Sequence, residues 1–207
     1  MSFQGTQGTT QLLSELWASG QTAAELAPGH TYNVEKYFWE AYDGLQNIRQ
    51  QIHHDAKKHA LSDYDFFITG HSLGGALASI CALDLVLSGI TTPEKIMLYT
   101  MGQPRVGDSE YAKAFDKYVP QSYRIVHSDD LVVHIPPEWL FGYTYEHTSQ
   151  EIWYNQDFTN YTECGPNDDP NCANSVWFYD WSIDDHLEYF NVHVGGSCAP
   201  TNSTVSI

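Results

Sequence analysis

Basic side chains are scarce in this 207-residue sequence: nine lysines and arginines stand against 26 aspartates and glutamates, for a formal net charge of −17. A surface this acidic would meet a phosphate backbone or an anionic membrane with like charge, so we expect neither nucleic acid nor anionic membranes as partners. No uninterrupted apolar run approaches the roughly 20 residues that span a bilayer, and we expect no transmembrane segment.

Cysteines are also few. Cys164 and Cys172 lie eight residues apart in the turn-rich stretch ECGPNDDPNCANS, which predicts a short bridged loop. No CxxC or HxxxH spacing is present, so the sequence gives no reason to expect a metal site. Cys81 falls in an apolar helical stretch and reads as a buried thiol, whereas Cys198 has no evident mate.

The first residues, MSFQGTQGTT, lack the basic start and apolar core of a signal peptide. Two glycosylation sequons, Asn160-Tyr161-Thr162 and Asn202-Ser203-Thr204, nevertheless suit a secreted protein, as does the predicted cysteine bridge. We therefore expect an extracellular location.

The length suits a single domain covering residues 1–207. Its 14 tyrosines, nine phenylalanines and six tryptophans favour a large apolar core or an aromatic-lined pocket. Hydrophobic spacing predicts helices that alternate with strands, which indicates an α/β fold with a largely parallel sheet flanked by helices. The expected helices are 35–59, 73–88, 109–118 and 184–191; the expected strands are 64–69, 95–101, 123–127, and a β pair of 142–145 with 151–154.

One turn carries chemistry. Residues 70–74, Gly-His-Ser-Leu-Gly, match G-x-S-x-G between a predicted strand and a predicted helix. Such a turn lifts Ser72 clear of the sheet and places it at a helix N-terminus, where free N–H groups favour developing negative charge. The alternative is an incidental serine in a glycine-containing turn. The strand before and the helix after favour a nucleophile.

A nucleophilic serine needs a basic histidine, which in this architecture comes last in the chain order Ser, Asp, His. His186, in DDHLEYF near the end, is our choice, with His193 and then His147 as alternatives. His71 lies inside the turn, and we expect it to point away from Ser72.

The acid should follow a strand at the carboxyl edge of the sheet, where chemistry collects in open α/β sheets. Asp129 and Asp130 follow the predicted strand RIVHS. Their spacing alone does not separate them, and an adjacent pair of acids can also be a solvated turn.

The blocks GHSLGGALA, SDDLVVHIPP and DDHLEYF together resemble the class 3 lipases, the fungal-lipase-like branch of the α/β-hydrolases, from residue 2 to about residue 198. The stretch 161–190 looks especially like secreted nematode members. The resemblance implies that Asp130 is the catalytic acid, with Asp129 in place of the family's preceding asparagine. It implies His186 as the base, and a structural role for His147.

The family's F-R-G-T/S element matches Phe3-Gln4-Gly5-Thr6, which implies that the Thr6 N–H and hydroxyl and the Leu73 N–H form an oxyanion hole. Glutamine replaces the usual arginine at position 4, and Val133 stands where proline is usual. The segment TTQLLSELWASG corresponds to the family's lid, with a packed helix as the alternative. Only three residues, Met1 to Phe3, precede Gln4 of this element. We therefore expect a shortened form that lacks the family's usual N-terminal strands. In fungal relatives a cysteine near the C-terminus bridges to that region, so its loss would leave Cys198 unpaired.

The sequence thus predicts a secreted serine ester hydrolase that cleaves acylglycerols or related lipid esters through an acyl-enzyme, with no cofactor and no metal. The expected partner is a lipid ester substrate at a lipid–water interface. One alternative is a non-catalytic or impaired hydrolase-like protein that binds lipid or a partner. A second is a phospholipase or a feruloyl-type esterase.

Overall fold

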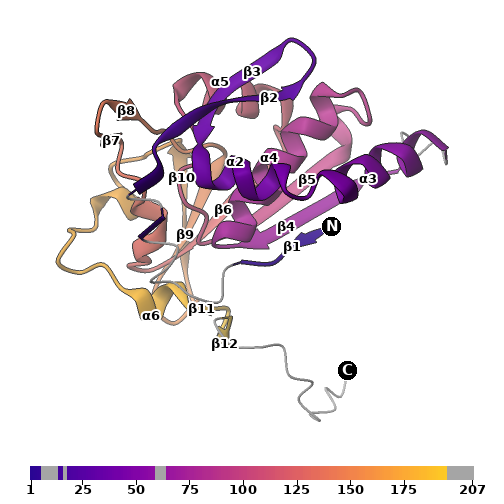
Figure 1. Cartoon of the computed structure of the whole chain (residues 1–207). Coiled ribbons are helices and arrows are strands. Elements are labelled where there is room, and N and C mark those ends of the chain that lie inside the picture. Colours follow the sequence, from indigo (N-terminus) through magenta and orange to yellow (C-terminus); the bar gives the residue numbers. More distant parts are fainter. Residues whose placement is uncertain (6–13, 16–17, 59–63, 195–207) are drawn as a thin grey trace, which may run out of the picture.

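The computed structural model describes residues 1–5, 14–15, 18–58 and 64–194 (Figure 1). A six-stranded sheet in the order β1-β4-β5-β6-β9-β10 forms its centre. Strands β1 to β9 of this sheet run parallel, and β10 runs antiparallel to β9. The bounds are Ser2–Phe3 (β1), Phe66–His71 (β4), Ile96–Met101 (β5), Ser122–His127 (β6), Gln150–Tyr154 (β9) and Tyr161–Pro166 (β10). The predicted α/β class with a largely parallel sheet is confirmed.

Figure 1 shows helices α2, α3 and α4 on one side of this sheet. Every residue from Leu73 to Leu85 of α4 is buried, which explains why this helix has no polar stripe. The free thiol of Cys81 is among them, as expected. The helices are Lys36–Asp43 (α2), Gln46–Lys58 (α3), Leu73–Leu87 (α4), Ser109–Tyr118 (α5) and Ile183–His186 (α6), with 3-10 turns at Pro93–Lys95, Leu131–His134 and Ala173–Ser175. None of the described helices is long and apolar enough to cross a bilayer.

The helix expected over 35–59 is two helices, so that prediction was wrong in its length. Glu35 ends a strand, and its carboxylate accepts the N–H of Phe38 as the N-cap of α2. Gly44 then caps the C-terminus of α2, and α3 begins two residues later. Glycine has a low helix propensity, and the amphipathic spacing continued through the break without marking it.

The β pair expected between 142–145 and 151–154 was also wrong. Tyr143–Thr144 (β8) pairs with Trp139–Leu140 (β7) across Phe141 and Gly142. These two turn residues have φ values of 50° and 93°, which suits a two-residue hairpin. The local turn therefore closes β8 back on β7, and β9 is free to add to the central sheet beside β6.

Three small sheets accompany the central one in the described part of the chain. The hairpin of Gln21–Ala27 (β2) with His30–Glu35 (β3), which the sequence analysis missed, packs on α2 and α4. Its turn contains Pro28-Gly29, a pair typical of turns. The third pair, Glu188–Tyr189 (β11) with Val192–His193 (β12), follows α6.

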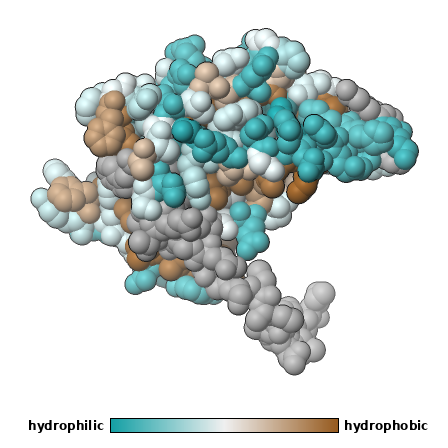
Figure 2. Space-filling view, in the orientation of Figure 1, coloured by the Kyte–Doolittle hydropathy of each residue, from teal (hydrophilic) through white to brown (hydrophobic). Residues whose placement is uncertain are grey.

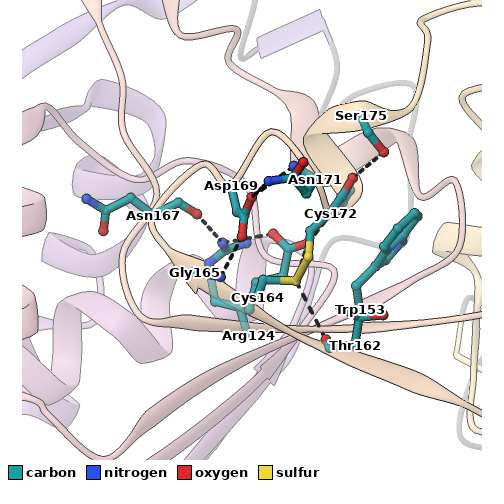
Figure 3. Close-up of a disulfide and its surroundings, with 12 residues drawn as sticks. Arg124, Trp153, Thr162, Cys164, Gly165, Asn167, Asp169, Asn171, Cys172 and Ser175 are labelled. Atoms are coloured by element: carbon teal, nitrogen blue, oxygen red, sulfur yellow. Dashed lines mark hydrogen bonds and ion pairs between the residues drawn. A yellow bond between two sulfur atoms is a disulfide. The ribbon is translucent and has the colours of Figure 1, made fainter.

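The predicted bridge between Cys164 and Cys172 is confirmed (Figure 3). It ties β10 to the 3-10 turn that starts at Ala173, whose N–H also donates to the Glu151 carboxylate at 3.0 Å. Arg124 pairs with the same carboxylate at 3.1 Å. These contacts attach the beginning of the segment that leads to α6, at Cys172 and Ala173, to the central sheet. Cys198 lies outside the described residues.

Candidate active site

Ser72 occupies a strained turn between β4 and α4. Its backbone has φ 58° and ψ −129°, a region that residues with a side chain rarely adopt. The flanking glycines are sterically required: a Cβ on Gly70 would lie 2.1 Å from the Gly74 carbonyl oxygen, and a Cβ on Gly74 would lie 2.2 Å from the Phe3 carbonyl oxygen. The G-x-S-x-G spacing therefore builds a strand–turn–helix unit that presents this serine.

Gly5 lies against the same turn. A Cβ added there would be 2.7 Å from the His71 carbonyl oxygen and 3.4 Å from the Ser72 Cβ. The next residue, Thr6, the predicted oxyanion donor, lies outside the described residues. Leu73, the other predicted donor, is the first residue of α4, in the turn whose N–H groups have no partner within the helix.

His186 and Asp130 form a buried pair. The His186 Nδ1 lies 3.0 Å from each carboxylate oxygen of Asp130, and both side chains are almost wholly inaccessible to solvent. Because a carboxylate only accepts, Nδ1 carries the proton and Nε2 is left as the basic nitrogen. This is the arrangement that an orienting acid gives a general base.

Two further donors bind the Asp130 carboxylate. The Tyr189 hydroxyl donates at 2.6 Å, and the Val132 N–H donates at 2.7 Å. Burial by itself would raise the pKa of Asp130, but the His186 ring and these two donors outweigh it and hold the pKa below its ordinary value. The acid therefore stays ionised beside the imidazole.

Ser72 is joined to this pair through its neighbours. Its N–H donates to the Met101 carbonyl at 2.9 Å, and the next residue, Gly102, packs against the pair. A Cβ on Gly102 would lie 2.7 Å from Asp130 Oδ2 and 2.9 Å from His186 Nδ1. The hydrogen bonds of the described residues include none between the Ser72 hydroxyl and the His186 ring. In unliganded hydrolases this bond is often long and tightens only with substrate.

Asp129, His147 and His193, the alternative acid and bases from the sequence analysis, make other contacts or are exposed. Asp129 holds the chain before His186: its N–H donates to the Asp185 carboxylate and its carbonyl accepts the Ser182 N–H. His147 is buried with its Nε2 2.7 Å from the Val133 carbonyl, and burial lowers its pKa well below the ordinary value. His193 is exposed on β12.

Tyr189 and Gly102 are site residues that the sequence reasoning missed. Tyr189 follows His186 by three residues and lies within the D-H-x-x-Y-F motif, so the motif itself was the available signal. Gly102 comes directly after β5 with φ 56°, at the same carboxyl edge of the sheet as Ser72. No pattern in the sequence distinguishes it from the other glycines.

A surface cleft of about 590 Å³ lies away from this site. Arg49, His53 and Ser88 contribute to its wall, and Ser88 caps the opposite end of α4 from Ser72. The cleft is therefore separated from the serine by the full length of a 15-residue helix, about 22 Å at 1.5 Å per residue.

Known proteins resemble this chain in sequence and in fold. The family model "Lipase (class 3)" matches residues 1–139. "Lipase ZK262.3" of Caenorhabditis elegans is 38% identical over 134 residues, covering 65% of this chain and 36% of the relative. "Secreted mono- and diacylglycerol lipase 1" of Fusarium solani is 38% identical over 135 residues, covering 65% and 37%.

Among solved structures, the crystal structure of a lipase from Rhizopus microsporus var. chinensis superposes with a TM-score of 0.80 at 30% identity, covering 93% of this chain and 65% of that one. The chain spans well under half the length of the two curated relatives. The family model covers about two thirds of the chain and includes both the Ser72 turn and Asp130. The chain therefore belongs to the class 3 lipase family and has its α/β-hydrolase fold.

Proposed function

We propose that this protein is a serine ester hydrolase that cleaves acylglycerols, and that Ser72, His186 and Asp130 are its catalytic residues. One observation carries the proposal: a buried His186–Asp130 pair lies at the carboxyl edge of the sheet, next to a serine held in a strained turn. Strain of this kind persists where the surrounding structure enforces it, and it gathers at catalytic sites.

In the proposed reaction the Ser72 hydroxyl attacks the ester carbonyl carbon while His186 Nε2 accepts its proton. The tetrahedral intermediate collapses, the bond to the alcohol oxygen breaks, and His186 returns the proton to the leaving alkoxide. Water then attacks the acyl-enzyme with His186 again as the base, which releases the fatty acid and restores Ser72. Asp130 keeps the imidazole oriented and stabilises the imidazolium.

The developing oxyanion would lie at the N-terminus of α4. The Leu73 N–H is one proposed donor and Thr6 the other. The position of Gly5 against the Ser72 turn supports this, since Thr6 follows it directly. Loss of one such donor typically costs about 100-fold in rate or more.

The assembled acid–base pair argues against a non-catalytic binding protein. Phospholipases and feruloyl-type esterases would share this triad. We favour acylglycerols because a related chain carries the name of a mono- and diacylglycerol lipase.

We further propose that residues 1–207 form one domain.

We propose that the protein is secreted. The Cys164–Cys172 disulfide and the exposed Asn160 sequon suit an oxidising compartment, and the Fusarium relative is named as secreted. Expression in a secreting eukaryotic host should give protein in the medium whose mass falls on glycosidase treatment. Retention of the whole product inside the cells would contradict this.

The activity is tested with a series of p-nitrophenyl esters and a fluorophosphonate probe. The unaltered chain should show burst acylation and label at Ser72. Ser72→Ala should lose both, with a rate at least about 1,000-fold lower. Ser109→Ala, which removes a serine at the start of α5, is the matched control and should keep them. Equal rates for Ser72→Ala and the control would reject the proposal.

A further inference from the structure

The β9–β10 hairpin carries a glycosylation sequon beside a surface hollow. Asn160 is exposed and comes directly before β10, and Thr162, the last residue of the sequon, is the second residue of that strand. A hollow of about 300 Å³ is lined by both residues and by Trp153 of β9. The amide that would be modified and a large aromatic residue therefore border the same space.

Asn160, Thr162 and Trp153 share one face of the hairpin. Thr162 lies opposite Trp153 in the antiparallel register, and residues that oppose each other in this way point to the same side. Side chains alternate along an extended chain, so that of Asn160, two residues before Thr162, points the same way. The hairpin pairing reaches Asn160, because its carbonyl accepts the Asn155 N–H at 3.1 Å. A sugar on Asn160 would therefore lie over Trp153.

Hydrogen bonds fix both sides of the hollow. The Trp153 indole N–H donates to the Ser128 carbonyl at 2.8 Å, and its ring packs on a small apolar cluster. The Asn160 N–H donates to the side-chain oxygen of Asn155 at 3.1 Å. One proton of the Asn160 Nδ2 is directed to the Thr159 hydroxyl at 3.2 Å, which leaves the other to be replaced by a sugar. The first sugar would thus meet preformed walls.

The composition of the hollow suits carbohydrate. Figure 2 shows brown, apolar surface at the left, over the β7–β8 hairpin, and the hollow differs from it in composition. Of the eight residues that line the hollow, five are serine, threonine, asparagine or glutamine and three are aromatic, and none is charged. Amides and hydroxyls bond to sugar hydroxyls, and the negative face of an aromatic ring attracts the C–H groups of a sugar.

The size and position of the hollow favour a single sugar at the edge of the sheet. Its volume equals the liquid volume of roughly ten water molecules, which suits one N-acetylglucosamine and not a branched glycan. In the described part of the chain, β10 is the last strand of the central sheet. An exposed edge strand can pair with another chain, and a bulky glycan beside it would hinder that pairing.

We propose that Asn160 carries an N-linked glycan whose first N-acetylglucosamine packs in this hollow against Trp153. This rests on the proposed passage through a secretory compartment and not on ester hydrolysis. In the transfer, Asn160 Nδ2 attacks the anomeric carbon of a lipid-linked oligosaccharide. The bond from that carbon to the pyrophosphate oxygen breaks, the lipid pyrophosphate leaves, and Nδ2 loses one proton. The packed sugar stabilises the β9–β10 hairpin.

The test uses the chain expressed behind a cleavable leader in a eukaryotic host that makes high-mannose glycans. Asn202→Gln is present throughout, so that Asn160 has the only sequon. Endoglycosidase H then leaves one N-acetylglucosamine on Asn160. Its acetyl methyl resonance should lie upfield of that of free N-acetylglucosamine, with nuclear Overhauser contacts to the Trp153 ring. In urea, this form should have an unfolding equilibrium constant roughly three- to tenfold smaller than Asn160→Gln.

Trp153→Leu should return the methyl resonance to its usual position. Trp139→Leu is the matched control, because Trp139 is an exposed tryptophan on β7 that does not line the hollow, and it should keep the upfield shift. If Trp153→Leu does not fold, the Overhauser contacts in the parent chain decide the question without a variant.

Three results would overturn the proposal: an unmodified Asn160, a sugar with the usual methyl shift and no contact to Trp153, or equal unfolding constants with and without the sugar. A glycosylated chain that stays inside the cells would count against secretion and would still report on the hollow. Ser72→Ala should give the same spectra, so failure of the hydrolase function leaves this result readable.

Discussion

The imidazole ring of His71 stacks on the ring of His186, with centroids 4.5 Å apart and 29° between the planes. The His71 Nε2–H also donates to the backbone carbonyl oxygen of His186 at 2.8 Å. Burial and the nearby His186 lower the pKa of His71 to about 4, so it is a neutral donor at neutral pH. His71, the residue before the proposed nucleophile, thus contacts both the ring and the backbone of the proposed base.

We expect His71→Phe to lower kcat about tenfold and to leave KM nearly unchanged. Phenylalanine keeps a ring against His186 but cannot donate to its carbonyl, so the base loses its fixed position while substrate binding is untouched. Steady-state kinetics on a dissolved ester measure this. His193→Phe, an exposed change on β12, should leave kcat alone. A kcat for His71→Phe equal to that of the control would contradict the positioning role.

Tyr189→Phe should lower kcat by roughly three- to tenfold, because the Asp130 carboxylate loses its shortest hydrogen bond. The pKa of Asp130 should rise, because the ionised carboxylate loses a hydrogen-bond donor, and steady-state kinetics on a dissolved ester measure the change in kcat. Tyr111→Phe is the matched control: it removes another buried hydroxyl, bonded to Ser79 at 2.8 Å and remote from the triad. If both variants lost stability and neither lost kcat, Tyr189 would be structural.

Gly102→Ala should abolish measurable activity. The added methyl group would lie within 3 Å of Asp130 and His186, at a backbone φ of 56° that alanine rarely adopts. Gly89→Ala carries the same backbone penalty at φ 68° but would meet no atom within 4 Å. Thermal unfolding and ester hydrolysis of both variants separate the two effects. Similar stability losses with activity lost only in Gly102→Ala are the expected result.

Glu35 should make stability depend on pH. Burial raises its pKa to about 7, against hydrogen bonds from Ser19 and the Phe38 N–H. A raised folded-state pKa means that its contribution to stability is complete below the unfolded value of about 4.5 and is lost as pH rises through 7. Relative to Glu35→Gln, the unaltered chain should lose about 3 kcal/mol of unfolding free energy between pH 4.5 and 8. Urea titrations at several pH values measure this difference.

Histidines act in the opposite direction over the same range. The pKa values of His71 and His134 are lowered to about 4, chiefly by burial, so their contribution is complete above 6.5 and is lost as pH falls through 4. Both chains in the Glu35 comparison contain these histidines, so their contribution cancels. A constant difference between the two chains at all pH values would contradict the Glu35 prediction.

Replacing both Cys164 and Cys172 by serine should reduce the unfolding free energy by about 2.5 kcal/mol, the chain-entropy value for closing an eight-residue loop. Because this loop fastens the start of the segment that leads to His186, kcat should fall as well. Denaturant unfolding and ester hydrolysis of the double variant measure the two effects. A variant as stable as the unaltered chain would show that the Glu151 contacts alone hold the segment.

The parts of the fold that the sequence predicted are those with strong local signals. The α5 bounds 109–118 and the strand–turn–helix around Ser72 follow from apolar spacing and paired glycines. The β7–β8 hairpin was missed because its turn depends on a positive φ at Phe141. A phenylalanine in the sequence does not predict such a backbone conformation. Helix spacing likewise ran through the break at Gly44.

In the site, the geometry brings together the acid and base that the motifs indicated. Spacing alone left Asp129 and Asp130 equivalent, because the choice depends on which carboxylate turns toward α6, a segment more than 50 residues later. Tyr189 and Gly102 act through contacts across the fold. Such contacts depend on how distant segments pack, and they produce no periodic pattern in the sequence.

The proposed nucleophile and base are made at different times, since His186 follows Ser72 by 114 positions in the chain. At about 5–20 residues per second, a ribosome would expose the serine turn roughly 6 to 23 s before the histidine that activates it. Under the proposed function, a nascent chain without His186 therefore carries Ser72 as an unactivated alcohol, and ester cleavage begins only after α6 has folded against the sheet.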